Sequence, residues 1–330
     1  MNHPAGSIYL LVLAVLIVTA AGVYILFARD LSLARARLAG HSETMQTSVG
    51  TLEYSVRGAG EPILAIHGAG GGFDQAIDMT GALVDHEYRL IAPSRFGYLR
   101  SSLPADLTVA MQADAYGELL DHLGIEQAVV VGISAGAWSS MQFAIRHPQR
   151  CRALVLIVPA DYLPDGTAVH GGALVKAMIS SDFVAWAALR LMATMPGAMS
   201  VAMLGTGRAV VRSADASEKA RVGQLLDHLL PVSPRYEGMQ FDIHTAAMRE
   251  PISIEKIACP VLTISAEDDR FGTAARARYI ASSVANGRAL IFSCGGHALV
   301  GRYADAMRES VAFISAPATH LASDHPRCST

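Results

Sequence analysis

The 330-residue chain has few charged side chains for its size. Asp, Glu, Lys and Arg make up 17% of its residues, against 52% that are hydrophobic, and the formal net charge is −3. A protein that binds nucleic acid usually carries a clear excess of basic residues, so the composition argues against a nucleic-acid partner. The sequence also shows no internal repeat and no low-complexity segment, and its length suffices for a large domain with an insertion.

Cysteine is scarce as well, with only four residues, at positions 151, 259, 294 and 328. None belongs to a C-x-x-C pair, and no Cys/His cluster has the spacing of a zinc site. We therefore predict no metal. Cys151, Cys259 and Cys294 lie beside predicted strands, where a reduced cysteine behaves as a small hydrophobic residue, and we favour that interpretation over a disulfide framework.

The first seven residues, MNHPAGS, contain no Lys or Arg, which a secretory signal peptide would normally have. The next twenty, Ile8–Phe27, carry no charge at all. A helix of that length is roughly 30 Å long, the thickness of the hydrocarbon layer of a bilayer. We expect an uncleaved single-pass membrane anchor, with cleavage near Ala20 or Ala21 as the alternative.

The charges that follow this segment indicate its orientation. Arg29, Arg35 and Arg37 stand against a single acidic residue, Asp30. Because basic residues collect on the cytoplasmic side of a membrane, the N-terminus is expected outside and the large domain in the cytoplasm. Packing of Arg35 and Arg37 on a protein surface would explain the same arginines equally well.

Beyond the anchor, short apolar segments alternate with helical ones. Asp30–Ser42 is typical of a short linker helix, and Gln46–Arg57 of one or two strands. Short, continuous apolar runs indicate strands buried on both faces. They are Ile63–His67, Tyr88–Ala92, Ala128–Gly132, Ala153–Val158, Val261–Ser265 and Ala289–Phe292. The predicted helices between and after them are Phe73–Val84, Thr108–Leu123, Ala137–His147, Ala274–Val284 and Leu299–Ile314. This alternation predicts an α/β fold with a mostly parallel, doubly wound sheet.

The alternation stops between Pro159 and about Pro251, where the sequence is helical, apolar and rich in Met. Arg190 and Pro196 interrupt this stretch, which favours an inserted helical cap over a second membrane span. Its apolar residues either fill a core, line a binding pocket or touch lipid. The expected organisation is an anchor at 1–29, a linker at 30–45, core at 46–158 and 251–316, the cap at 159–250 and a C-terminal tail at 317–330.

The pentapeptide Gly132-Ile-Ser134-Ala-Gly136 directly follows an apolar strand and precedes a predicted helix. A strand that ends in G-x-S-x-G and turns sharply into a helix exposes the serine hydroxyl at the edge of the sheet. Ser134 is therefore the candidate nucleophile. The backbone N–H of Ala135 would point at the group that Ser134 attacks.

A serine nucleophile needs a base and an acid that orients the base. His297 lies in a Gly-flanked loop after the last predicted strand and is the candidate base. Three consecutive carboxylates follow the preceding strand, and of these Asp269 is the preferred acid and Asp268 the alternate. Asp161, just past another strand, is a third possibility.

The loop from His67 to Gly72 contains five residues without bulky side chains. Backbone N–H groups in such a loop can approach a developing oxyanion, and Ala69 paired with Ala135 is the preferred pair of donors, with Gly68 or Gly70 as alternates. The loop has neither the G-x-G-x-x-G spacing of a dinucleotide site nor a G-K-[ST] element. We predict no cofactor.

Together, H-G-x-G-G, G-x-S-x-G, the late Asp and G-G-H resemble the alpha/beta-hydrolase superfamily from about residue 47 to 315, apart from the cap, and the position of the cap also matches. The resemblance implies a triad of Ser134, Asp269 and His297 with an oxyanion hole at Ala69 and Ala135. The sequence departs from many relatives at Ser94, where they carry Asp, and at Leu99, where they carry a second Gly. These departures leave the substrate preference more open than the triad.

The favoured function is a serine hydrolase that cleaves an ester or related acyl bond of a small to medium apolar molecule through an acyl-enzyme on Ser134. The same triad would serve a C–C bond hydrolase of the meta-cleavage-product type, an acyltransferase or a cofactor-free haloperoxidase. Relatives that use Asp as nucleophile, such as haloalkane dehalogenases, are disfavoured by Ser134. A catalytically silent, membrane-tethered binding protein is the alternative from outside the enzymes.

Overall fold

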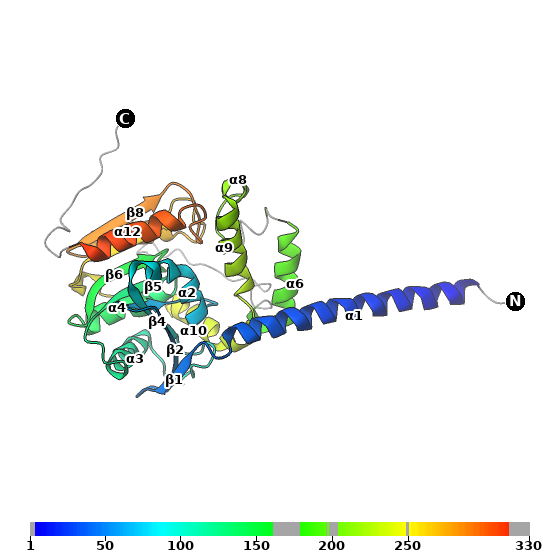
Figure 1. Cartoon of the computed structure of the whole chain (residues 1–330), viewed down its shortest axis with the longest axis horizontal. Coiled ribbons are helices and arrows are strands. Elements are labelled where there is room, and N and C mark those ends of the chain that lie inside the picture. The colour runs from blue at the N-terminus through cyan, green and yellow to red at the C-terminus, as the bar shows by residue number, and fades with distance from the viewer. Residues whose placement is uncertain (1–3, 161–178, 196, 198–203, 249–250, 317–330) are drawn as a thin grey trace.

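A mixed β-sheet forms the centre of the molecule (Figure 1). The computed structural model describes residues 4–160, 179–195, 197, 204–248 and 251–316. Within them the sheet has eight strands in the order β1-β2-β4-β3-β5-β6-β7-β8. Their bounds are Glu43–Gln46 (β1), Thr51–Arg57 (β2), Glu61–Ile66 (β3), Tyr88–Ser94 (β4), Ala128–Ile133 (β5), Cys151–Ile157 (β6), Val261–Ala266 (β7) and Gly287–Phe292 (β8). Strand β2 pairs antiparallel with both β1 and β4, and all other neighbouring strands pair parallel, as predicted for the main sheet.

Helices cover both faces of this sheet. They are α2 (Phe73–Thr80), α3 (Val109–His122), α4 (Gly136–Arg146), α11 (Thr273–Ser283) and α12 (Tyr303–Ser315), with a 3₁₀ turn, η1 (Gly81–His86), after α2. Successive residues of β3 point to opposite faces: Leu64 packs in the core cluster that holds α3 and α4, and Ile63 in the cluster that holds α12. Burial on both faces explains why the strands are continuous apolar runs rather than alternating ones.

The cap follows β6, as predicted, and its described helices are α6 (Asp182–Ala193), α8 (Arg208–Ser213), α9 (Ala216–Asp227) and α10 (Tyr236–Met248), with a short η2 (Ser233–Arg235) before α10. A second short turn, η3 (Ile254–Lys256), precedes β7. A buried ion pair fixes α10 to the core, because both guanidinium nitrogens of Arg95 donate to Asp242, at 2.7 and 2.6 Å.

The N-terminal helix α1 (Pro4–Leu38) projects from the globular part as a long rod (Figure 1). Among the described residues it is the one helix long and apolar enough to cross a membrane, and none of its most apolar 18-residue segment is buried in the protein. The segment predicted as a separate linker helix from Asp30 is helical up to Leu38, but it continues the preceding helix without a break as the last quarter of α1. Leu31 and Ala34 of this segment are buried against the globular part, which explains why the helix continues.

The arginines used to predict the orientation have partners in the protein. Arg29 pairs with Asp30, Arg35 lies 3.7 Å from Asp182, and Arg37 donates to Asp74 at 2.6 Å. The positions of Arg35 and Arg37 therefore also follow from packing of α1 on the globular part, which explains these two arginines without a membrane.

Candidate active site

Ser134 occupies a strained turn between β5 and α4. Its φ is +49°, a left-handed conformation that costs a residue with a side chain about 1–2 kcal/mol. Backbone hydrogen bonds hold it there, because its N–H donates to the Ile157 carbonyl at 2.9 Å and its carbonyl accepts from Ala137 and Ala160. The turn projects the hydroxyl beyond the carboxyl edge of the sheet, as the pentapeptide indicated.

The two glycines of the pentapeptide are required by close packing. A Cβ at Gly136 would lie 2.5 Å from the carbonyl oxygen of His67 and 2.6 Å from that of Ile66. A Cβ at Gly132 would lie 2.5 Å from the hydroxyl of Ser140. These distances are well below van der Waals contact. Strand β5, helix α4 and the end of β3 can therefore meet at this point only if both positions lack a side chain.

A continuous hydrogen-bonded chain runs from Ser134 through His297 to Asp269. The serine Oγ lies 3.0 Å from His297 Nε2, and His297 Nδ1 lies 2.9 Å from Asp269 Oδ2. The histidine side chain is 24% exposed, while the carboxylate of Asp269 is fully buried. The structure thus brings together the three residues that the sequence singled out, from strands far apart in the chain.

Several contacts hold Asp269 in its ionised form. Burial raises the pKa of this carboxyl, but the hydrogen bond and charge of His297, the Thr273 hydroxyl and the Phe271 N–H outweigh burial and lower the pKa below its ordinary value. An ionised, immobile carboxylate at Nδ1 fixes the orientation of the imidazole and favours the tautomer whose Nε2 faces Ser134 as an acceptor.

Asp268, the alternate acid, points elsewhere. Its Oδ1 accepts from the N–H of Gly296 at 2.9 Å, and its Oδ2 accepts from the hydroxyl of Thr206. It therefore holds the loop that carries His297 instead of contacting the imidazole. Asp161, the third possibility, lies outside the described residues.

The cap contributes to this arrangement in a way that the sequence did not indicate. The N–H of His297 donates to the Leu204 carbonyl at 2.7 Å, and the N–H of Arg270 donates to the Gly205 carbonyl at 3.1 Å. A Cβ at Gly205 would lie 2.9 Å from Asp269 Oδ1. Cap residues 204–206 thus pack directly behind the Asp269 and His297 loops.

The glycine-rich loop after β3 lies against the serine. A Cβ at Gly68 would be 3.0 Å from the Cβ of Ser134. The N–H groups of the two alternate oxyanion donors are already engaged: Gly68 donates to Gln75 Oε1 at 2.8 Å and Gly70 to the Tyr98 hydroxyl at 3.4 Å. In the described part of the chain, the N–H groups of Ala69 and Ala135 have no acceptor.

His67 fixes the start of this loop. It is completely buried, and its Nε2 accepts from the N–H of Arg95 at 2.8 Å, so the proton is on Nδ1, which donates to the Gly68 carbonyl at 2.7 Å. Burial, together with the positive charge of Arg95, lowers its pKa well below the ordinary value. His67 is therefore a neutral structural residue that orients the backbone of the loop.

An ion cluster closes the other end of the loop. Asp74, in the first turn of α2, accepts from Arg235 at 2.8 and 3.1 Å and from Arg37 of α1 at 2.6 Å. The side chain of Arg235 is completely buried and that of Asp74 is 7% exposed. Sequence reasoning missed this cluster, because its members come from the N-terminal helix, the core and the cap.

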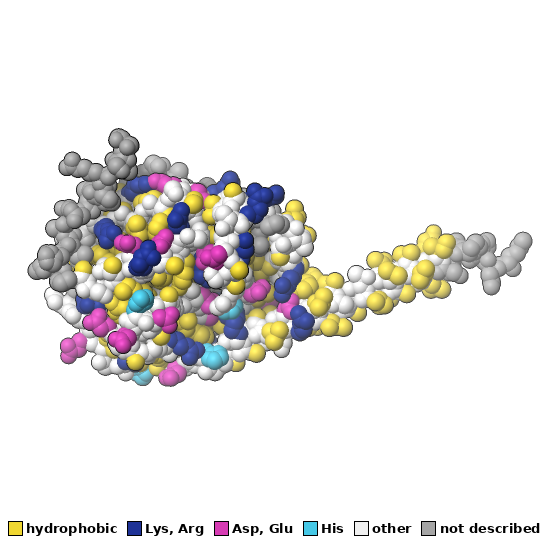
Figure 2. All heavy atoms as spheres, turned by 45° about the horizontal axis from the view of Figure 1, so that its top comes forward, with side chains coloured by type: hydrophobic (Ala, Val, Ile, Leu, Met, Phe, Trp, Pro, Cys, Tyr) yellow, Lys and Arg dark blue, Asp and Glu magenta, His cyan; other side chains and the backbone are white. Residues whose placement is uncertain are grey.

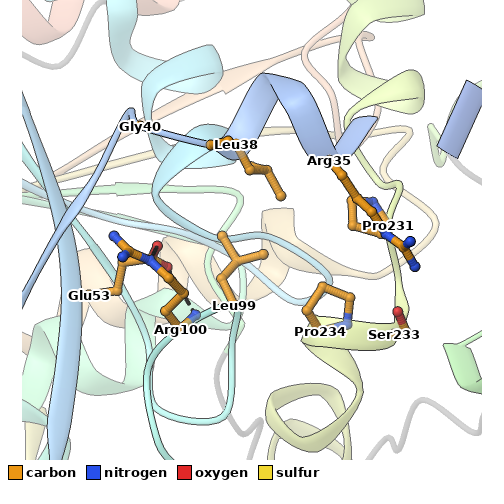
Figure 3. Close-up of a pocket in the computed structure, with 10 residues that line it drawn as sticks. Arg35, Leu38, Gly40, Glu53, Leu99, Arg100, Pro231, Ser233 and Pro234 are labelled. Atoms are coloured by element: carbon orange, nitrogen blue, oxygen red, sulfur yellow. Dashed lines mark hydrogen bonds and ion pairs between the residues drawn. The ribbon is translucent and has the colours of Figure 1, made fainter. Parts of the chain in front are cut away.

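Apolar side chains of the cap lie beside the loop. A Cβ at Gly70 would be 3.7 Å from the sulfur of Met239 and 3.8 Å from Leu229 Cδ2. A separate pocket of about 450 Å³ lies at the C-terminal end of α1, between Leu38, Leu99, Pro234 and the charged groups of Arg35, Arg100 and Glu53 (Figure 3). None of its lining residues belongs to the site at Ser134, so this pocket does not mark the reaction centre.

The departure from the usual pattern at Leu99 has a visible consequence. Its φ is +53°, which glycine adopts without strain, and its N–H donates to the Pro234 carbonyl at 2.6 Å. Ser94, where many relatives carry Asp, donates to Glu53 at 2.8 Å and accepts from the N–H of Phe73 at 3.1 Å. Both residues hold loops and neither contacts Ser134.

Comparison with known proteins agrees with this architecture. Residues 61–301 match the family model of the alpha/beta hydrolase fold. The chain is 43% identical to the hydrolase YcgS of Bacillus subtilis over 114 residues, which cover 34% of this chain and 40% of the relative. It is 33% identical to a 2-hydroxy-6-oxo-6-phenylhexa-2,4-dienoate hydrolase of Comamonas testosteroni over 113 residues, 33% of this chain and 40% of that protein.

These alignments span less than half the length of either curated relative. A solved alpha/beta hydrolase fold protein from Nakamurella multipartita superposes over 83% of this chain and 98% of its own, with a TM-score of 0.66 and 24% identity. The family model covers well over half of the chain, and the strand order is that of a mostly parallel sheet with a cap after β6. The chain belongs to the alpha/beta hydrolase family.

Proposed function

We propose that this hydrolase is a membrane-anchored serine hydrolase that cleaves carboxylic esters or related acyl bonds through an acyl-enzyme on Ser134. The observation that carries the proposal is the unbroken hydrogen-bonded chain from Ser134 Oγ through His297 to Asp269. A serine hydroxyl is a weak nucleophile by itself, and a base within 3.0 Å of Oγ is what converts it into an effective one.

In the first half of the reaction, Ser134 Oγ attacks the substrate carbonyl and its proton moves to His297 Nε2. The carbonyl oxygen becomes negatively charged, and the free N–H groups of Ala69 and Ala135 stabilise it. The charge of Asp269 stabilises the imidazolium. When the intermediate collapses, the leaving alcohol takes the proton from Nε2, which leaves an acyl group on Ser134 and a neutral His297.

In the second half, a water molecule replaces the alcohol. His297 removes a proton from this water as it attacks the acyl carbon, and the same two N–H groups hold the second oxyanion. Collapse of this intermediate returns the proton from Nε2 to Ser134 Oγ and releases the carboxylic acid. Both proton transfers that involve Ser134 take place with His297, and the serine Oγ and the histidine Nε2 lie 3.0 Å apart.

The preferred substrate is a small to medium apolar ester. This part of the proposal is supported by Met239 and Leu229, whose side chains border the glycine-rich loop at Gly70. Four buried charged side chains of the core and cap form two ion pairs, Asp74 with Arg235 and Arg95 with Asp242. These four groups are therefore not free to bind a charged substrate.

A fluorophosphonate probe tests the nucleophile. The full chain in detergent should be labelled, and Ser134→Ala should abolish labelling and turnover of p-nitrophenyl esters together. Ser282→Ala, on the exposed side of α11, is the matched control and should retain both. Labelling that persists in Ser134→Ala would refute the assignment of the nucleophile.

C–C bond hydrolysis is the second candidate, because the chain resembles the dienoate hydrolase of Comamonas testosteroni over about a third of its length. A matched panel of p-nitrophenyl esters and a 2-hydroxy-6-oxo-dienoate separates the two activities. Much higher kcat/KM on the dienoate than on any ester would replace the ester proposal by this one.

The anchor is proposed from the length and exposure of the apolar part of α1. We propose that the chain crosses the bilayer once, with the catalytic domain on the cytoplasmic side. Protease added to the outside of sealed cells should leave the domain intact. Digestion from outside would reverse the orientation, and recovery of the full-length chain in the soluble fraction would refute the anchor.

A further inference from the structure

The cap helix α6 carries only two charged side chains, and both are used to hold it in place. Asp182 accepts from the N–H groups of Val232 and Ser233, at 2.7 and 2.9 Å. Arg190 donates to Asp30 of α1 at 2.6 Å. Trp186 adds a hydrogen bond from its indole N–H to the same carboxylate at 2.9 Å. This helix is therefore fixed to α1 at several points.

The remaining surface of α6 is apolar and exposed. Phe183 is 44% exposed, Leu191 63%, and Met195, two residues past the end of the helix, 54%. Single exposed apolar residues are common on soluble proteins, but three large ones gathered at one helix, whose only two charges are engaged in ion pairs and hydrogen bonds, are not. Such a surface indicates an apolar or interfacial partner.

The position of α6 along α1 identifies that partner. Phe27, the last residue of the uncharged segment, contacts Phe183 with 5.2 Å between ring centroids and Trp186 with 5.7 Å. The rings therefore lie where the span would leave the hydrocarbon layer, which is where aromatic side chains concentrate in membrane proteins. Figure 1 shows α6 meeting α1 near its junction with the globular part, and Figure 2 shows hydrophobic side chains along α1 with basic side chains near that junction.

We propose that the exposed surface of α6, formed by Phe183, Leu191 and Met195, rests in the headgroup region of the bilayer that α1 crosses. This inference depends on the proposed anchor and adds a second lipid contact, made by the cap. The partner is the lipid surface because the patch is continuous with the apolar surface of α1 through Phe27. The contact would hold the cap, and with it the site at Ser134, next to the membrane.

Quenching of tryptophan fluorescence by brominated lipids tests the contact. The full chain is reconstituted in phosphatidylcholine vesicles whose acyl chains carry bromine near the headgroup or near the bilayer centre. Three variants each add one tryptophan to the two native ones: Leu191→Trp on α6, Val15→Trp in the anchor, and Tyr279→Trp on α11 as the matched control. Residue 279 is partly exposed and lies on the helix beside β7 and β8, at the far edge of the sheet from β1.

We expect the added emission of Leu191→Trp to be lost with shallow bromine, that of Val15→Trp with deep bromine, and that of Tyr279→Trp with neither. Quenching of Val15→Trp without quenching of Leu191→Trp would overturn the α6 contact and leave the anchor intact. If Val15→Trp itself escapes quenching, the anchor is wrong and the α6 contact falls with it. Ester turnover in each variant verifies that the fold is retained.

Discussion

Replacing Asp74 by Asn should strongly destabilise the protein. Asp74 lies between Arg235 of the cap and Arg37 of α1, two residues past the glycine-rich loop. Asn preserves the shape of the side chain but removes its charge. The guanidinium of Arg235, which is completely buried, would then have no carboxylate to neutralise it.

The expected cost follows from this burial. Removing one partner of a buried pair costs about 3–5 kcal/mol, because the other charge stays in the interior without compensation. For a protein of this size the corresponding fall in Tm is on the order of 10 °C. Arg37→Met should cost only about 1 kcal/mol, because Arg37 is 23% exposed and Asp74 keeps its pairing with Arg235.

Denaturant unfolding of the full chain in detergent, followed by near-ultraviolet circular dichroism, measures these differences. The double variant Asp74→Asn/Arg37→Met should cost little more than Asp74→Asn, because both changes remove the same ion pair. A cost of under 1 kcal/mol for Asp74→Asn, or strictly additive costs in the double variant, would refute the reasoning that the three charges form one buried unit.

Three further predictions concern pH, packing and catalysis. Burial raises the pKa of Asp74, but the charge of Arg235 outweighs burial and holds the pKa well below 3.8. In denaturant titrations, the extra stability of the wild type over Asp74→Asn should therefore be constant down to about pH 4 and should shrink as the pH falls further. In the same assay, Gly136→Ala should cost about 1–3 kcal/mol, because its Cβ would meet two backbone carbonyls. Gly223→Ala in α9, where a Cβ would have no atom within 4 Å, should be neutral or stabilising. Equal effects of the two substitutions would contradict the packing argument. Steady-state kinetics should show kcat/KM lowered about 10⁴-fold in Asp269→Asn and far less in Asp268→Asn, and the reverse order would exchange their assignments.

Much of the fold follows from local patterns that the sequence states directly. Continuous apolar runs predicted the parallel strands, because a strand that is buried on both faces is apolar at every position. The glycines of the pentapeptide and of the loop after β3 marked sharp turns, and their neighbours Ser134 and Ala69 lie at the edge of the sheet. Order along the chain then placed Asp269 and His297 at adjacent strand ends, where the structure has them in contact.

Local patterns could not decide which of three consecutive carboxylates faces the histidine. Asp268 and Asp269 bind different partners, and one partner of Asp268 is Thr206, a cap residue about sixty positions away in the chain. The ion pairs of Arg95 and Arg235 likewise join distant segments, so no periodicity or spacing reveals them. The end of α1 was misjudged for the same reason, because burial of Leu31 and Ala34 against the globular part continues the helix beyond the uncharged segment.

These distant contacts determine how the cap can move. The cap carbonyl of Leu204 accepts from His297, and Thr206 binds Asp268, so displacement of this segment would disturb the pairing of His297 with Asp269. The other end of the cap is fixed by Arg235 and Asp242, because separating either buried charge from its partner would cost several kcal/mol of free energy. Segments 204–206 and 235–242 are therefore held rigidly to the catalytic core. Helix α6, by contrast, is held through its charged side chains to α1 and to the Val232–Ser233 backbone, so its position follows that of α1.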